Sequence, residues 1–334
     1  MLGLRAECVV EHYAGCPPSP VYIGVRRFAT RTLFAGVSGN RRPQAVRQID
    51  MALKPIILTI LMFGVSRGLG VTSEPSENSQ ASANELVRKI VANEIKAETE
   101  DHSHWAFQLQ TEKGGRRELE EVVETKDGNL QRPVCVNGQP LTAKQKEEAN
   151  LHIQKLVHNP GALRRSLRDE SEDTTRSQNM LKLMPHAFNF SYEEKDSGDL
   201  VKLKFTPNPR FRPPSREALV FHAMEGEITV NDRQQRLAEI LGHLIHEVKF
   251  GGGLLGHLDK GGLFHVGQEQ VSPGFWELTV LNVQMKGKVL FFKTIGVRQK
   301  IIRSGFRRVS DDLPLAQAAE ILRESAMTAT DSCK

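Results

Sequence analysis

The second half of the sequence consists of long strand-like segments joined by very short turns. The turns include Asn231-Asp232, Pro273-Gly274 and Lys286-Gly287-Lys288. Strands joined by so few residues pair in antiparallel fashion. The expected strands are Ala218–Met224, Glu227–Val230, Leu237–Phe250, Gly262–Val271, Phe275–Met285 and Val289–Arg303. Consecutive hairpins of this kind curl a sheet around a core, so we expect a coiled antiparallel sheet, an incomplete β-barrel.

Helices are expected on both sides of an early hairpin, which makes the fold class α+β. Residues 142–184 are charged and helix-favouring, and Asn159-Pro160-Gly161 divides them into two helices. We expect this inserted helical hairpin to lie over the rim of the sheet, either as a lid or as a solvated spacer. The other expected elements are an N-terminal helix at 84–100, strands at 105–111 and 118–125, and a last helix at 315–322.

The long strands carry an apolar face. In Leu237–Phe250 the even positions are nearly all apolar, and His246 shares their face. In Phe275–Met285 the apolar phase changes between Val280 and Leu281, which predicts a β-bulge or strong coiling of the strand. Such strands can line a concave site for an acyl chain, although helices could equally fill that face as an ordinary core. The expected lining residues are Trp105, Phe107, Leu244, Val248, Phe250, Trp276 and Leu278.

A possible export signal begins at Met51. Lys54 precedes a short apolar run at 56–65, and small and polar residues follow to Ser73, which is the plan of a secretory signal peptide with cleavage near Gly70 or Ser73. We therefore expect a periplasmic or secreted protein. Residues 1–50, rich in arginine, are expected to be a disordered extension or, alternatively, an organellar transit peptide. The remaining divisions are a flexible tether at 74–83, a single domain at 84–323 and a disordered tail at 324–334.

Charge and cysteine content constrain the partners. Residues 1–73 hold nine of the 45 basic residues and three of the 40 acidic ones, so the rest of the chain carries 36 against 37, a net charge of −1. That balance removes the argument for a nucleic-acid partner. Cys135 and Cys333 remain after cleavage, and whether they form a disulfide is left open.

The sequence lacks recognisable catalytic motifs. It contains neither Gly-x-Ser-x-Gly nor His-Glu-x-x-His, and the glycines at 251–262 are not followed by the Lys-Ser/Thr of a phosphate loop. We therefore expect neither an enzyme nor a cofactor. A zinc site is the alternative, because histidines recur in the strand-rich half, although His243 and His246 are three apart and so fall on opposite faces of a regular strand. The candidate ligands are His222, His246, His257 and His265.

Two segments resemble a known group of proteins. The run Phe221-His222-Ala223-Met224-Glu225-Gly226-Glu227-Ile228-Thr229-Val230-Asn231, and Arg236-Leu237-Ala238-Glu239-Ile240 leading to Gly242, are similar to the LolA-like and LppX-like carriers of bacterial cell envelopes. The likeness covers roughly residues 84–310 and is one of pattern. It implies an incomplete β-barrel closed by helices that binds acyl chains of a lipid or lipoprotein in the periplasm. The charged insertion and the glycine-rich stretch depart from that pattern.

The expected function is therefore non-enzymatic binding of a hydrophobic ligand by an exported protein of the bacterial cell envelope. The expected partner is a lipid or a lipoprotein acyl chain, with transient contact to a membrane surface and a monomeric state. The alternatives are a zinc-binding secreted module and a structural envelope protein without a ligand.

Overall fold

The computed structural model describes residues 77–193, 198–289, 293–328 and 333, and within them it shows one large, curved antiparallel sheet with helices. The expected α+β class is confirmed. The strand order is β4-β3-β2-β1-β13-β12-β11-β8-β7-β6-β5, and the short β10 pairs with β9 and β12. The strands are β1 (His104–Lys113), β2 (Arg116–Val123), β3 (Leu130–Val136), β4 (Gln139–Pro140), β5 (Phe188–Tyr192), β6 (Leu200–Pro207), β7 (Met224–Asn231), β8 (Arg236–Leu244), β9 (Val248–Phe250), β10 (Gly256–Leu258), β11 (Leu263–Ser272), β12 (Phe275–Val289) and β13 (Lys293–Val309).

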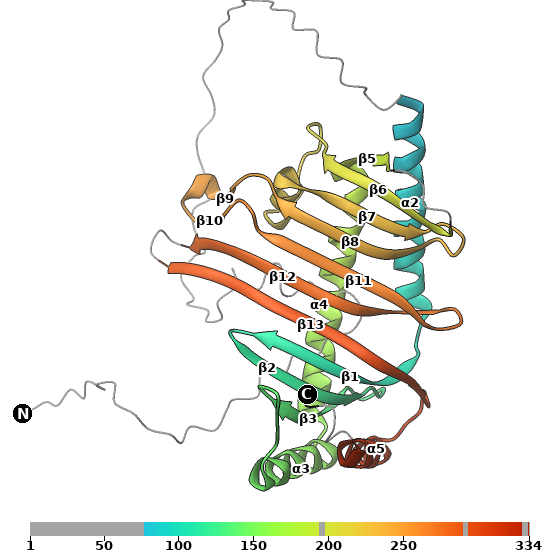
Figure 1. Cartoon of the computed structure of the whole chain (residues 1–334), viewed down its shortest axis with the longest axis vertical. Coiled ribbons are helices and arrows are strands. Elements are labelled where there is room, and N and C mark those ends of the chain that lie inside the picture. Colours follow the sequence, from blue (N-terminus) through green and yellow to red (C-terminus); the bar gives the residue numbers. More distant parts are fainter. Residues whose placement is uncertain (1–76, 194–197, 290–292, 329–332, 334) are drawn as a thin grey trace, which may run out of the picture.

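Two long helices cover one face of this sheet and two shorter ones pack at its β3 end (Figure 1). The proposed signal peptide, its cleavage positions and residues 1–50 lie outside the described residues. The helices are α2 (Glu77–Glu100), α3 (Ala143–His158), α4 (Gly161–Ala187) and α5 (Leu315–Thr328), and the short 3-10 segments are η1 (Glu217–Ala223) and η2 (Gly251–Gly253).

The register places a continuous apolar row on the helix-covered face. Six residues on six neighbouring strands stand directly opposite one another, and every one is buried. They are Ile301, Leu281, Val266, Ile240, Ile228 and Leu203. Because residues of one row must share a face, this row defines the inner surface of the sheet.

The predicted bulge in β12 keeps that face apolar. Gly267 pairs with Val280, but the next residue, Gln268, pairs with Leu278, so Thr279 is an extra residue in β12. The bulge is confirmed at the position of the phase change. Next to the row, Gly242 on β8 leaves space for the ring of Phe264 on β11, which a Cβ at that position would overlap.

Helix α2 is fixed to the β5 to β8 half of the sheet. It buries Val87, Ile90 and Val91, and the side-chain oxygen of Asn84 accepts a hydrogen bond from the backbone N–H of Phe190 on the edge strand β5 (2.9 Å). That contact protects a sheet edge that could otherwise pair with another chain. The helix begins at Glu77, before the expected start at Asn84, so part of the expected tether is helical.

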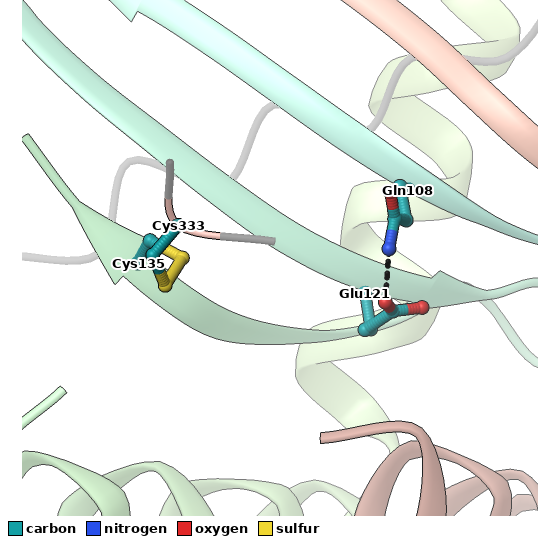
Figure 2. The surroundings of a disulfide bond; sticks show 4 residues. All are labelled: Gln108, Glu121, Cys135 and Cys333. Carbon is teal, nitrogen blue, oxygen red and sulfur yellow. Dashed lines mark hydrogen bonds between the residues drawn. A yellow bond between two sulfur atoms is a disulfide. The ribbon is translucent and has the colours of Figure 1, made fainter. Parts of the chain in front are cut away.

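A second, smaller core lies on the opposite face of the sheet at β1, β2 and β3. Ala106, Val123 and Leu130 pack there against apolar residues of α3 and α5. Beside them the amide of Gln108 donates to the buried carboxylate of Glu121 (3.0 Å), as Figure 2 shows. Burial raises the pKa of Glu121, and the Gln108 bond and the Arg307 charge oppose that rise.

The pairing of Cys135 with Cys333, left open by the sequence, is present as a disulfide with a Cα to Cα distance of 5.7 Å (Figure 2). The bond ties Cys333 to β3. Since α5 also continues past Glu324 to Thr328, residues 324–328 and Cys333 differ from the expected disordered tail.

Three expectations about elements are wrong. Residues 218–224 were expected to form a strand, but Glu217–Ala223 form the 3-10 segment η1. Leu237–Phe250 is not one strand, because β8 ends at Leu244 and β9 starts at Val248, with a bend between them. The inserted hairpin does not lie over the rim, because its second helix, α4, crosses the inner face of the sheet (Figure 1).

Candidate functional site

The predicted lining residues are all buried, but they form two groups at opposite ends of the strands. Trp105, Phe107, Trp276 and Leu278 lie at one end, and Leu244, Val248 and Phe250 lie at the other. Val248 pairs with Leu258, which faces Gly287, nine positions along β12 from Leu278. Nine strand residues span about 30 Å. The two groups therefore cannot contact one small molecule, although both border the same long apolar face.

The first group is an aromatic cluster. Trp105 contacts Phe275 edge-on (ring centroids 5.8 Å apart), and Phe107 stacks on Phe306 (5.2 Å). The guanidinium of Arg308 lies 5.0 Å from the centre of the Phe275 ring. These contacts pack Trp105 and Phe107 against the protein's own rings.

Helix α4 starts at the second core, beside the turn between β2 and β3, and then crosses the inner face toward β5 (Figure 1). At its start, Leu163 packs against Gly128 in the turn between β2 and β3, and its end leads directly into β5. Its 27 residues measure about 40 Å. The strands from β3 to β5 are nine steps apart, or roughly 43 Å along the curved sheet. A straight helix that joins the two sides of a curved sheet lies across it as a chord.

Only the ends of α4 are held by buried apolar side chains. Leu163 belongs to the core at β2 and β3, whereas Leu181 and Met184 belong to the main core. Between residues 164 and 179 the helix has a single apolar side chain, Leu167, and it is only half-buried. The buried residues of that middle stretch are Glu170, Asp173 and Ser177. The buried side of the helix is therefore polar along its middle, where Glu170 accepts a hydrogen bond from the side-chain amide of Asn129 (3.4 Å).

The sheet contributes both apolar and polar groups to this region. Leu109 on β1 and Ile301 on β13 are buried on the inner face. Arg303, opposite Leu109, is 2 % exposed, and its guanidinium lies 5.0 Å from the Phe107 ring centre. Glu120 pairs with Leu109 from the other side. We define the α4 seam as the middle of α4, residues 164–179, together with the inner face of β1, β12 and β13 at Leu109, Leu281 and Ile301.

Glu120, which pairs with Leu109, is a titratable group of this region with a strongly shifted pKa. Burial, together with the neighbouring carboxylate of Glu118, raises the pKa of Glu120 to about 7, and the charge of Arg116 opposes that rise. The carboxyl is thus half-protonated near neutral pH. A neutral carboxyl costs less to keep beside apolar side chains than a carboxylate does.

The histidines do not form a metal centre. Within the described part of the chain, no three His, Cys, Asp or Glu side chains converge to hold a metal ion, so the zinc alternative is not supported. His257 contacts Asp259 (3.2 Å) and Glu247, and His265 contacts Glu239 (2.8 Å). His222 packs against Phe211 instead. His246 lies exposed in the bend after β8, so its predicted place on the apolar face is wrong.

A surface pocket of about 440 Å³ lies away from all of these residues. It is formed between α2, the β5–β6 pair and the β7–β8 turn, and its walls carry charges of both signs. Sequence reasoning missed it because its walls come from separate parts of the chain. Its lining residues are Ser82, Glu85, Leu86, Lys89, Tyr192, Val201, Asp232 and Gln235.

Sequence reasoning also missed the α4 seam. The alternation of Val297, Gln299, Ile301 and Arg303 in β13 was a usable signal for a face of mixed polarity. Nothing in the sequence placed α4 opposite it, since that depends on the strand order. Among the described residues, no helix combines the length and the apolar character that crossing a membrane requires.

No protein-family model matches the chain, and no curated protein matches it. Among solved structures, the chain is similar to the crystal structure of a DUF1329 family protein from Desulfovibrio piger, at 11% sequence identity and a TM-score of 0.24, over 70% of this chain and 95% of that one.

Proposed function

We propose that this is an exported, non-enzymatic protein that binds a lipid or a lipoprotein acyl chain at the α4 seam. The observation that carries the proposal is the unequal anchoring of α4, which buries apolar side chains at its two ends and polar ones in between. Its middle can separate from the sheet while exposing almost no apolar surface of its own. Leu109, Leu281 and Ile301 would then be open to an apolar guest.

The two sides of the seam suit an amphipathic ligand. The acyl chain would lie along the apolar row of the sheet, where each Å² removed from water contributes about 25 cal/mol. Glu170, Asp173 and Ser177 on α4 and Arg303 on β13 would face the polar part of the ligand. The resemblance to envelope carriers supports the same class of ligand.

Export is part of the proposal. The Cys135–Cys333 disulfide supports it, because disulfides persist mainly in oxidising compartments such as the periplasm or the extracellular space. The proposed partners are the lipid or acyl chain and, transiently, a membrane surface. We propose a monomer without a nucleic-acid partner.

Binding is tested with a fatty acid that carries an environment-sensitive fluorophore, and by mass spectrometry of an organic extract of the natively purified protein. Ile301→Trp would fill the seam and should weaken probe binding about tenfold. Ile302→Trp, one residue along on the opposite face, should leave it unchanged. Circular dichroism checks that both variants fold.

A third variant separates the seam from the surface pocket. Leu86→Trp narrows that pocket and should not affect probe binding. If Leu86→Trp weakens binding while Ile301→Trp does not, the ligand lies in the surface pocket and the proposed site is wrong. If the extract holds no lipid and no variant changes the signal, the protein is a structural one.

A further inference from the structure

The β9–β10 loop carries two adjacent leucines into solvent. Leu254 is 66% exposed and Leu255 is 39% exposed. Single exposed leucines are common on soluble proteins, but two neighbours at the tip of one hairpin are less so. The loop lies at the end of the sheet where β9 and β10 extend the strands (Figure 1).

The sequence builds this loop with glycines that fix its shape. Gly251, Gly252 and Gly253 have φ values of 58°, 64° and 95°, in the left-handed region that residues with a Cβ rarely adopt. The backbone N–H of Leu254 donates to the carbonyl of Gly251 (3.1 Å), and that of Leu255 donates to the carbonyl of Phe250 (3.1 Å). The leucines are thus held outward by a hydrogen-bonded turn.

Exposed lysines lie on β9, on β12 and just after β10, next to the strands that carry this loop. Lys249, His257 and Lys288 stand directly opposite one another on β9, β10 and β12, so they share one face. Lys260 and Lys286 lie beside them, because the N–H of Asp259 donates to the carbonyl of Lys286 (2.8 Å). All four lysines are exposed. We call Leu254, Leu255 and these four lysines the leucine tip.

The acidic residues of this region are engaged by a histidine. Glu247 and Asp259 both contact the ring of His257, at 3.6 and 3.2 Å. The four ammonium groups therefore outnumber the nearby carboxylates by two to one. Two exposed leucines on a loop next to a group of lysines match the chemistry of an anionic bilayer, whose phosphates attract lysine and whose interfacial layer takes up leucine.

We propose that the leucine tip docks the protein on an anionic membrane surface. Leu254 and Leu255 enter the interfacial region, and Lys249, Lys260, Lys286 and Lys288 contact lipid phosphates. The tip and the α4 seam share no residue, so docking does not depend on ligand binding and either proposal can fail alone.

A local reporter tests the docking in the full chain. Leu254→Trp should shift its fluorescence to the blue and be quenched by brominated lipid on vesicles of phosphatidylcholine with about one-third phosphatidylglycerol. The native Trp105 and Trp276 are buried, so they contribute a constant background. Leu151→Trp, at an exposed leucine of α3, should not be quenched. If the chain binds vesicles while Leu254→Trp stays unquenched, another segment makes the contact and the proposal is overturned.

Affinity is measured by vesicle flotation. The double variant Leu254→Ser/Leu255→Ser should bind vesicles at least about tenfold more weakly than the unmodified chain. Raising the salt concentration from about 0.1 M to about 0.5 M should weaken vesicle binding by the unmodified chain, because salt screens the lysine charges. The matched control is Leu151→Ser/Leu200→Ser, which removes two exposed leucines elsewhere. Equal binding of the two double variants contradicts the proposal. So does a concentration-dependent dimer that only the Leu254→Ser/Leu255→Ser variant loses, because the tip would then bind a second copy.

Discussion

At the scale of single residues, one buried carboxylate fixes α2 to the sheet. Glu94 is 3% exposed and accepts hydrogen bonds from Arg236 Nε (2.7 Å) and Nη2 (3.2 Å) and from the backbone N–H of Leu237 (2.8 Å). The guanidinium of Arg236 also lies 5.6 Å from the ring centre of Trp276. A buried pair of this kind specifies where the helix sits more than it adds net stability.

Glu94→Ala should therefore be strongly destabilising. It leaves the largely buried guanidinium of Arg236 without its carboxylate partner, and we expect a loss of about 3–5 kcal/mol in the free energy of unfolding, measured by urea denaturation. Glu100→Ala, which removes one side of an exposed pair with Lys96 (3.9 Å), should change it by less than about 1 kcal/mol. Equal losses of stability in Glu94→Ala and Glu100→Ala would show that burial of the Glu94–Arg236 pair does not increase its contribution to stability.

Glu120 predicts a pH dependence of stability. Its pKa is raised from 4.5 in the unfolded chain to about 7 in the folded protein, so the folded state holds the proton more tightly. The resulting stability is fully present below pH 4.5 and is lost as the pH rises through about 7. Because the residue is partly exposed, we expect a change of only about 2 kcal/mol.

Glu120→Gln should remove that component of the pH profile. Thermal melts at intervals from about pH 4 to about pH 8 measure it. Glu118→Gln should shift the loss to lower pH, because the Glu118 charge helps to raise the pKa of Glu120. An unchanged profile in Glu120→Gln would assign the dependence to other groups.

At the scale of elements, α4 is the helix whose position is least expected from its sequence. Its middle stretch is as polar as a solvated helix, and the sequence did allow for a solvated spacer. The folded protein instead buries Glu170, Asp173 and Ser177. A seam with polar residues on the helix and apolar ones on the sheet adheres less strongly than a fully apolar one.

Ser177→Leu tests the adhesion of the seam. If the seam has room, the added apolar side chain should raise stability by about 1 kcal/mol and weaken acyl-probe binding, because α4 would be harder to displace. Thr175→Leu, on the exposed side of the same helix, should do neither. A loss of about 1–3 kcal/mol in Ser177→Leu would instead indicate a fully packed seam, contrary to the proposed site.

Element boundaries were predictable where a single local signal dominated. Asn159-Pro160-Gly161 separates α3 from α4 as expected, and the phase change before Leu281 marks the β12 bulge. The signal failed for η1, where an apolar run looks like a strand but Ser215 Oγ accepts from the N–H of Ala218 and starts a 3-10 turn. It failed again after Leu244, where Ile245 and His246 form a bend and β9 begins only at Val248.

At the scale of the whole molecule, the disulfide joins residues 198 positions apart. Closing so long a loop removes many conformations of the unfolded chain, and the chain-entropy estimate of the stabilisation is about 5 kcal/mol.

Most lining residues were predictable as buried, because alternation identifies the inner face. Their division into two groups was not, since it depends on the distances along β12 that only the complete sheet defines.

The double variant Cys135→Ser/Cys333→Ser should lower the free energy of unfolding by about 2–5 kcal/mol in guanidinium denaturation. Reductant should destabilise the unmodified protein by a similar amount and leave the double variant unaffected. If reductant has no effect on the unmodified protein, the bond does not contribute to its stability.

The strand order places β1 beside β13, so residues 104–113 pair with residues 299–309. During synthesis the first three strands must wait for almost the whole remainder of the chain before their neighbour exists. Until the ribosome has released the last strand, the inward apolar side chains of β1, Trp105, Phe107 and Leu109, have no finished sheet to join. A nascent chain truncated before β13 should therefore bind chaperones strongly.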